Sequence, residues 1–566
     1  MNSKTMAFYP SHLRSLFTNR ERELDLLQQA TASLAEGRPR HLALFGLRRI
    51  GKTLLLLEHA ARLLQTSPES PVRPVYVDFE ELVTSPELFS RRYVGLVTFW
   101  AITQGGGEIE SFLTPTGLLG GPAAGLRTVA QTLAALQEAR DDPATQITLA
   151  LDFPEKLAQE LDCRLLLLLD EFTELTVLSN YPSVRRPLQL FRAAMQRHDR
   201  LGYVIAASAI SAMREMVQDG SSPLFLQFEQ VEVSHFPPDA TLALAERTLG
   251  DTPPPGVGRR LHQLTGGHPF YIHAVATRLT RPLSTGSGQI HSEIEPDDVL
   301  RAFVLETLSR TGQIYNYCRY LYDTSLQRAR GYGILKAILQ VMAEEEGLTL
   351  SEVARRIHKT APTTRGYLRA LQEVDLVVEN EGAYFYRDPV LRYWAAYATR
   401  GIEVDAFASR TALAPLLADL EARHSRLATE LGLAKESTVR ELLRCFAGQE
   451  VSGTLLGASG SVRLPAFVQV APYRSPDGQI EVDALAETEE AENGERWAVE
   501  VKWRRKAAGK KELTALLQKA QTLDARPWLI SRSGFTEAAR TYAAGHGLLL
   551  STRADLEKLE RQLSES

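Results

Sequence analysis

The sequence predicts a multidomain α/β protein, and three observations support this prediction. A glycine-rich segment, residues 46–53, lies between an apolar run typical of a strand and one typical of a helix. A continuous apolar run at 165–169 ends in two carboxylates, as a buried parallel strand does. Near the C-terminus, residues 479–485 and 496–503 alternate apolar and polar side chains, which indicates a β-hairpin. The 566 residues suffice for about three or four domains.

The composition is that of an ordinary globular protein, with 44% apolar and 23% charged residues. No apolar run approaches the ~20 residues that span a bilayer, and the first residues lack the apolar core of a secretory signal. We therefore expect a cytoplasmic protein without membrane contact. Cys163, Cys318 and Cys445 are far apart and odd in number, which supports neither a disulfide framework nor a metal cluster. The net charge of −5 gives no overall nucleic-acid signature.

The glycine-rich segment reads Gly-Leu-Arg-Arg-Ile-Gly-Lys-Thr and fits the phosphate-binding pattern G-x-x-x-x-G-K-[ST]. In such a loop, backbone N–H groups and the start of the following helix surround phosphate oxygens. Lys52 would reach the outer phosphates, and the Thr53 hydroxyl would bind Mg²⁺. This predicts a site for ATP with Mg²⁺. The loop residues that we expect at the nucleotide are Gly46, Arg48, Arg49, Gly51, Lys52 and Thr53.

A phosphate loop needs an acidic partner on a neighbouring strand, and the run that ends in Asp170 and Glu171 supplies it. Asp170 would hold Mg²⁺, and Glu171 would polarise the attacking water. The alternative is a buried strand that simply meets solvent at two carboxylates. Residues 74–79 and 202–208 are expected to be further strands of the same sheet.

This arrangement resembles the additional-strand class of P-loop ATPases, and the resemblance implies that Ser208 senses the γ-phosphate. The order of four segments along the chain resembles, more specifically, the archaeal-type ATPases of the STAND branch of AAA+ proteins. The segments are Asn19-Arg20-Glu21, the loop 46–53, Asp170-Glu171-Phe172 and Gly267-His268-Pro269-Phe270-Tyr271.

The STAND resemblance implies that Asn19 and Arg20 lie near the nucleotide base and that Pro269, in a helical lid, senses the nucleotide. The chain departs from the family at residues 224–228, where related sequences often carry a candidate trans-acting arginine. Slow hydrolysis, or hydrolysis that needs a partner such as a second copy of the chain, is therefore expected.

Residues 331–388 have the pattern of three helices followed by a hairpin, which resembles a winged helix. Its third helix, 360–371, would expose Arg365, Tyr367 and Arg369 to a DNA groove. A winged helix that binds protein, or that inhibits the ATPase, remains an equal alternative.

The C-terminal hairpin carries a second group of candidate catalytic residues. If it folds about residue 491, Asp483 lies opposite Val499 or Glu500, and the alternation places Glu500 and Lys502 on one face. Two carboxylates and a lysine suit metal-assisted phosphodiester cleavage, with Asp483 and Glu500 holding Mg²⁺ and Lys502 activating water. The alternatives are a solvated, charged hairpin and a nuclease fold without activity.

The hairpin resembles the PD-(D/E)XK nucleases of the restriction-endonuclease-like fold. In that family a preceding helix often carries a further acidic residue, and Glu436 or Glu441 could play this part. The basic residues directly after the motif could contact phosphates. These are Arg504, Arg505 and Lys506.

We predict five segments: an ATPase core (1–235), a helical lid (236–300), a winged-helix region (301–400), a helical linker (401–435) and a nuclease-like domain (436–566). The combined prediction is an ATP-switched nuclease, with DNA or alternatively RNA as substrate. A nucleotide-dependent homo-oligomer and a protein trigger are the expected partners, and a role in prokaryotic defence or mobile-element biology is implied. The alternatives are a DNA-binding regulatory ATPase that does not cut, and a scaffold whose winged helix binds protein.

Overall fold

The computed structural model describes residues 8–565 with gaps. The gaps are 67–69, 122, 281–293, 329–331, 346, 381, 407, 410, 421–438, 441, 444–445, 476–479, 489–493 and 504–505. The chain divides into two compact units, Met1–Leu413 and Ala414–Ser566, which we call the first and the second unit. In the described part of the chain, no helix combines the length and apolarity that crossing a membrane requires.

The first unit contains a five-stranded parallel sheet in the order β2-β3-β4-β1-β5. The strands are β1 (Leu42–Phe45), β2 (Val72–Asp78), β3 (Arg164–Asp170), β4 (Leu201–Ala207) and β5 (Glu229–Glu232). Strand β4 lies between the strand that enters the glycine-rich loop and the strand that ends in the acidic pair. This confirms the predicted α/β class and brings the ends of β1, β3 and β4 to one edge, because parallel strands end together.

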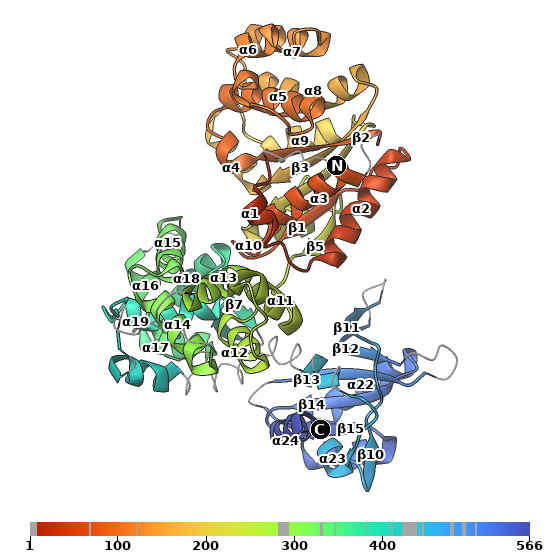
Figure 1. Cartoon of the computed structure of the whole chain (residues 1–566), viewed down its shortest axis with the longest axis vertical. Helices are drawn as coiled ribbons and strands as arrows, with labels where there is room; N and C mark the ends of the chain where they lie inside the picture. Colours follow the sequence, from red (N-terminus) through yellow and green to blue (C-terminus); the bar gives the residue numbers. More distant parts are fainter. Residues whose placement is uncertain are drawn as a thin grey trace. The chain divides into compact units, whose positions relative to one another are not determined.

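Both faces of this sheet are covered by helices (Figure 1), which explains why its strands are apolar throughout. On one face pack α2 (Glu21–Ala35) and α3 (Lys52–Thr66), through residues such as Leu27 and Leu56. The other face packs against α5 (Pro86–Thr103), α8 (Pro143–Glu160) and α9 (Pro187–Met195). The remaining helices of this part are α1 (Ser11–Arg14), α4 (Phe79–Leu82), η1 (Glu110–Phe112), α6 (Pro115–Gly120), α7 (Arg127–Glu138), η2 (Phe172–Asn180) and α10 (Ile210–Gln218).

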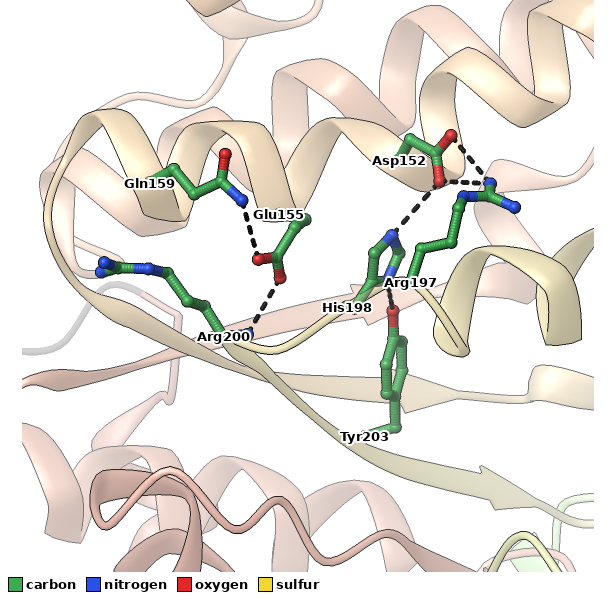
Figure 2. Close-up of polar contacts among 7 residues, drawn as sticks. All are labelled: Asp152, Glu155, Gln159, Arg197, His198, Arg200 and Tyr203. Carbon is green, nitrogen blue, oxygen red and sulfur yellow. Dashed lines mark hydrogen bonds and ion pairs between the residues drawn. The ribbon is translucent and has the colours of Figure 1, made fainter.

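A polar cluster fixes α8 to the start of β4 (Figure 2). The buried His198 ring lies between the Tyr203 hydroxyl (2.6 Å from Nδ1) and the carboxylate of Asp152 (3.3 Å from Nε2), which also accepts two hydrogen bonds from Arg197. Nearby, Glu155 accepts the backbone N–H of Arg200 at 3.0 Å. The cluster lies at the amino end of β4, away from the strand ends that carry ligands in such sheets, so we interpret it as structural.

A helical segment follows the sheet within the first unit. It contains α11 (Pro238–Leu249), α12 (Pro255–Thr265), α13 (Pro269–Leu279), α14 (Pro296–Leu308) and α15 (Gln313–Arg328). The expected winged helix comes next, with the three-stranded antiparallel sheet β6-β8-β7. Its elements are α16 (Tyr332–Glu344), β6 (Leu348–Thr349), α17 (Leu350–Arg356), α18 (Ala361–Glu373), β7 (Val377–Asn380), β8 (Ala383–Tyr386) and α19 (Pro389–Ala398). A capping box formed by Thr349 and Glu352 starts α17.

The second unit is built on a mixed sheet in the order β11-β12-β13-β14-β15, antiparallel as far as β13 and parallel after it. Its five strands are β11 (Gln469–Arg474), β12 (Glu481–Glu487), β13 (Arg496–Lys502), β14 (Arg526–Ser531) and β15 (Leu549–Thr552). Helices α22 (Lys510–Thr522) and α23 (Glu537–His546) cover one face, and α24 (Arg553–Glu565) and η3 (Gly453–Leu456) cover the other. Strands β9 (Glu450–Ser452) and β10 (Ser461–Arg463) form a separate pair.

The larger core of the second unit is aromatic. Trp497 and Trp528 are fully buried and meet edge to face, with ring centroids 5.8 Å apart. Such a contact adds about 1 kcal/mol beyond the burial of the rings. This core holds β13 and β14 in place, and β13 carries two of the predicted nuclease residues.

Candidate nucleotide and nuclease sites

The glycine-rich loop joins β1 to α3 in the predicted strand–loop–helix order. A Cβ at Gly46 would lie 2.4 Å from the carbonyl oxygen of Val233, so no larger residue fits there. Gly51 has φ +102°, which favours glycine. Arg49 adopts φ +62° without being glycine, a strained conformation of the kind found at functional loops.

Lys52 is the first residue of α3, and its side chain is buried within the loop. Its ammonium group donates hydrogen bonds to the carbonyl oxygens of Gly46 (2.9 Å) and Leu47 (3.0 Å). Burial lowers the pKa of Lys52 to about 8, against the attraction of Glu171 and Asp170. A lysine in this state can bind phosphate as a cation at neutral pH, and phosphate charge would raise its pKa again.

Asp170 lies at the end of β3, next to the start of α3, and is 1% exposed. The Thr53 hydroxyl donates a hydrogen bond of 2.5 Å to its Oδ2, and Tyr76 donates a second one of 3.2 Å. Burial raises the pKa of Asp170. A hydroxyl and a carboxylate in contact at the start of the helix are oxygen donors that suit Mg²⁺. Tyr76, on β2, is a site residue that the sequence did not reveal.

Glu171 has φ +45°, so the chain turns sharply after β3 and sends this side chain towards β4. Its carboxylate accepts hydrogen bonds from the hydroxyl and from the backbone N–H (3.1 Å) of Ser208. The predicted water-polarising glutamate and the predicted sensor serine therefore touch each other directly.

The helical segment contacts the glycine-rich loop through the carbonyl oxygen of Arg48. This oxygen accepts hydrogen bonds from the Tyr317 hydroxyl (3.1 Å) and from Nε2 of His268 (3.2 Å). Burial lowers the pKa of His268 well below its usual value, so its ring is neutral and donates through Nε2. Pro269 follows as the first residue of α13. The Gly-His-Pro segment therefore lies at the glycine-rich loop.

The two loop arginines extend into aromatic side chains of the same segment. Arg49 lies over the rings of Phe270 and Tyr317, at 4.4 and 4.7 Å from their centroids. Arg48 donates a hydrogen bond of 2.9 Å to the Tyr320 hydroxyl. Cation–π contacts of this kind contribute about 1 kcal/mol each. Tyr317 and Tyr320 lie on α15, and the sequence predicted no contact of this helix with the glycine-rich loop.

Asn19 and Arg20 lie just before α2, and both have positive φ values, +60° and +81°. The buried Arg20 guanidinium donates a hydrogen bond of 2.9 Å to the carbonyl oxygen of Ile50, inside the glycine-rich loop. It also lies over the ring of Phe236, 4.7 Å from the centroid. Arg20 therefore stabilises the glycine-rich loop through its hydrogen bond to Ile50. Asn19, the residue before it, is half-buried.

The predicted groove-facing residues lie on α18. Arg365 and Arg369 are exposed and Tyr367 is half-buried. Arg369 pairs with Glu373 at 3.2 Å, an ordinary surface pair along a helix. Helix α18 therefore exposes two arginines, of which Arg369 is paired with Glu373.

The turn after α18 is fixed to the ATPase core. Asp375 accepts a hydrogen bond of 2.7 Å from the Ser211 hydroxyl and bonds of 3.2 Å from the Ser211 backbone N–H. It also pairs with Arg387 at 3.2 Å. Ser211 belongs to α10, which starts shortly after β4, the strand that ends at Ala207 just before Ser208. This contact involves residues far apart in sequence and was not predicted.

In the second unit, Asp483, Glu500 and Lys502 are brought together. The register pairs Ala484 with Val499, which places Asp483 next to Glu500. The Asp483 carboxylate accepts the backbone N–H of Val501 at 2.6 Å, and Lys502 pairs with Glu500 at 2.7 Å. Burial raises the pKa of Asp483, and the Glu500 carboxylate adds to this effect. Two neighbouring carboxylates that destabilise each other's charge suit a divalent cation.

Two further cations contact this group and were missed. Lys519, on α22, lies 3.2 Å from Glu500 Oε2, and Arg440 donates a hydrogen bond of 2.7 Å to the Asp483 carbonyl oxygen. The sequence signal that could have indicated Lys519 is its place next to the apolar positions of α22, such as Leu516 and Ala520. Lys506 is exposed. The predicted residues that lie outside the described residues are Arg504, Arg505, Glu436 and Glu441.

No group of three or more His, Cys, Asp or Glu residues with metal-binding geometry occurs in the described ranges. Within the described residues, the Asp483–Glu500 pair is a two-carboxylate site. Cys163 and Cys318 are buried free thiols.

Two segments match known protein families. Residues 439–559 match Mrr_cat, a restriction endonuclease family, and residues 334–381 match the IclR helix-turn-helix domain. No curated protein sequence matches the chain.

Solved structures resemble the chain only loosely. A Walker-type ATPase of Pyrococcus abyssi has 16% identity over 67% of this chain and 96% of its own, with a TM-score of 0.47. The ORC2 protein of Aeropyrum pernix, in its ADPNP–ADP complexes, has 15% identity over 69% and 98%, with a TM-score of 0.41. Cdc6p of Pyrobaculum aerophilum has 15% identity over 71% and 97%, with a TM-score of 0.32.

The class of protein follows from the fold, the two sites and the family match. The first unit is a P-loop ATPase core with a helical segment and a winged helix, and the second unit carries a restriction-endonuclease domain. The chain therefore joins a P-loop fold to a domain that matches a restriction endonuclease family. Such domains use a nucleotide and a divalent metal.

Proposed function

We propose that this protein is a nucleotide-switched nuclease that binds ATP with Mg²⁺ in the first unit and cleaves DNA with the second. The observation that carries the proposal is the convergence of Asp483, Glu500 and Lys502 on adjacent strands. In the same chain, Lys52, Thr53 and Asp170 meet at the glycine-rich loop. We also propose the five-segment division given by the sequence, with the linker near the boundary at Leu413.

In the ATPase site, Lys52 would exchange its bonds to the loop carbonyl oxygens for phosphate oxygens. Thr53 and Asp170 would hold Mg²⁺, which offsets phosphate charge when bound. Glu171 would orient the attacking water and accept its proton, and Ser208 would hold Glu171 in place. Arg20, Arg48 and Arg49 would fix the shape of the loop and its contact with the lid, with Asn19 and Pro269 at its edges.

In the nuclease site, Asp483 and Glu500 are the carboxylates that would hold Mg²⁺, which activates water and stabilises charge on the phosphate when bound. The backbone N–H of Val501 orients Asp483, and Lys502 would hold the attacking water or the phosphate oxygen. Lys506, Arg504 and Arg505 would bind the nucleic-acid backbone.

Two contact chains support control by nucleotide. Glu171 touches Ser208, and three residues later Ser211 is bound to Asp375 of the winged helix. The loop itself is bound by His268 and Tyr317. A nucleotide that binds one arrangement of these groups more tightly than another would shift the winged helix and lid. A homo-oligomer, a protein trigger and a role in prokaryotic defence are consistent with this design.

The test is a cleavage assay with full-length protein on DNA and RNA, with Mg²⁺ and with or without ATP. Wild type should cleave DNA, and Glu500→Gln should lower the rate by about 100-fold or more. Lys52→Ala should remove the effect of ATP. Glu481→Gln is the matched control, because Glu481 is exposed on the neighbouring strand β12, which carries Asp483.

A second function is supported by the exposed, basic α18. If wild type binds DNA but cleaves neither DNA nor RNA under any of these conditions, the protein is a DNA-binding regulatory ATPase. If it binds no nucleic acid, a scaffold whose winged helix binds protein is the better description.

A further inference from the structure

Lys519 reaches the nuclease group from a different element than the motif residues. It lies on α22, next to the buried Leu516 and Ala520, which pack this helix on the sheet. Its aliphatic stem therefore runs along an apolar surface, and its ammonium group emerges at Glu500. The Nζ–Oε2 distance is 3.2 Å.

Glu500 is thus held between two lysines. Lys502 contacts Oε1 at 2.7 Å, and Lys519 contacts Oε2 at 3.2 Å. The Glu500 side chain is only 12% exposed, and the lysine side chains are 25% and 27% exposed. This is a partly buried, geometrically fixed pair of contacts rather than a mobile surface pair.

The group holds more basic than acidic side chains. Asp483 and Glu500 are its two carboxylates, Lys502 and Lys519 both contact Glu500, and Arg440 contacts the carbonyl oxygen of Asp483. A carboxylate pair without Lys519 would attract a divalent cation more strongly. With it, the cation must compete with an ammonium group for Glu500.

We propose that Lys519 is a positioning residue of the nuclease site, which fixes the orientation of Glu500 and weakens divalent-cation binding there. This inference rests on the proposed nuclease function. Loss of Lys519 frees the Glu500 carboxylate to rotate and removes a competing charge. Cation affinity should therefore rise while cleavage becomes slower, whereas a merely structural lysine would lower both.

The test compares Lys519→Met, which keeps the length and apolar stem, with Lys519→Arg, which keeps the charge. Mn²⁺ binding to full-length protein without nucleotide is followed by the electron paramagnetic resonance of free Mn²⁺. The Asp483→Asn variant gives the background from other sites. Lys558→Met is the control, because Lys558 is exposed on α24. Cleavage is measured at saturating Mn²⁺.

For Lys519→Met we expect the Mn²⁺ dissociation constant to fall by about threefold or more and the cleavage rate to fall by about tenfold or more. Lys519→Arg and Lys558→Met should stay within about threefold of wild type. Unchanged or weaker Mn²⁺ binding by a folded Lys519→Met variant would overturn the proposal. If the Lys519→Met variant does not fold, the same measurements are made on Lys519→Gln. If wild type cleaves nothing, the nuclease function fails, while the Mn²⁺ affinities still decide the effect of Lys519 on Glu500.

Discussion

The phenol of Tyr271 donates a hydrogen bond to the carboxylate of Asp388, and both groups are buried. Asp388 also accepts the backbone N–H groups of Val390 (2.8 Å) and Leu391 (3.2 Å) and so caps α19. Tyr271 belongs to the Gly-His-Pro-Phe-Tyr segment of α13. Two residues separated by more than a hundred positions therefore meet in one hydrogen-bonded group, which joins the helical segment to the end of the winged helix.

Removal of this hydrogen bond should destabilise the first unit. Tyr271→Phe leaves the buried Asp388 carboxylate without one of its donors, so we expect the free energy of unfolding to fall by about 1–3 kcal/mol. Urea denaturation followed by circular dichroism measures the change. Tyr181→Phe is the control, because its hydroxyl bonds to the Thr84 carbonyl oxygen at an exposed position. Equal effects of the two substitutions would contradict this account.

The pKa of Lys52, about 8, makes nucleotide affinity dependent on pH. Below pH 8 the side chain is charged and binds phosphate, and above it the neutral amine must take up a proton first. We expect ATP affinity to weaken by about tenfold between pH 7 and pH 9. Isothermal titration in buffers of different ionisation enthalpy should show proton uptake near pH 8.

The same shift affects stability. The unfolded lysine titrates near its ordinary pKa of 10.5, so between about 8 and 10.5 the unfolded state binds more protons. The free energy of unfolding should therefore gain a contribution from Lys52 as pH rises through this window. Lys52→Met should lack both this contribution and the pH dependence of ATP affinity.

Glu171 should matter for hydrolysis and hardly for binding. Its carboxylate faces Ser208 and not the loop carbonyl oxygens, so Glu171→Gln should change the ATP dissociation constant by less than about threefold. The hydrolysis rate should fall by about 100-fold or more, since the amide is no base. Binding by titration and phosphate release measure the two effects. A parallel loss of binding would show that Glu171 has a different role.

Asp375 should hold the winged helix on the ATPase core. Asp375→Ala leaves Arg387 without its carboxylate and removes the bonds to Ser211, so we expect a loss of about 3 kcal/mol in unfolding free energy. Limited proteolysis should become faster between the core and the winged helix. Glu215→Ala, at an exposed position of α10, is the control.

The basic face of α18 distinguishes nucleic-acid binding from protein binding. If it contacts phosphates, Arg365→Ala and Arg369→Ala should each reduce the slope of log affinity against log salt by about one. Fluorescence anisotropy with labelled DNA at several salt concentrations measures this slope. Unchanged slopes would favour a protein partner for this face.

Much of the ATPase core could be predicted, because its signals are local. The glycine-rich loop, the acidic end of β3 and the strand before Ser208 are each continuous in sequence. The hairpin of β12 and β13 was predictable for the same reason, since alternation fixes which side chains share a face. The resulting contacts of Asp483, Glu500 and Lys502 follow directly from that register.

The contacts from distant segments could not be predicted. Tyr317 and Tyr320 are ordinary helix residues in sequence, and only the packing of α15 brings them to the loop. In sequence, Asp375 is an ordinary turn residue, and only the packing of α10 brings Ser211 to it. Lys519 shows the same limit, because amphipathic spacing tells which face of a helix is buried and not what lies beyond it.

The edge-to-face pair of Trp497 and Trp528 has a practical consequence. Of the five tryptophans in the chain, Trp497, Trp503 and Trp528 lie in the second unit, and only Trp100 and Trp394 lie in the first. Indole rings that meet edge to face at this distance couple their electronic transitions, so the near-ultraviolet circular dichroism should be dominated by the second unit. The circular dichroism of this tryptophan pair can therefore be used to follow unfolding of the second unit separately from unfolding of the first unit.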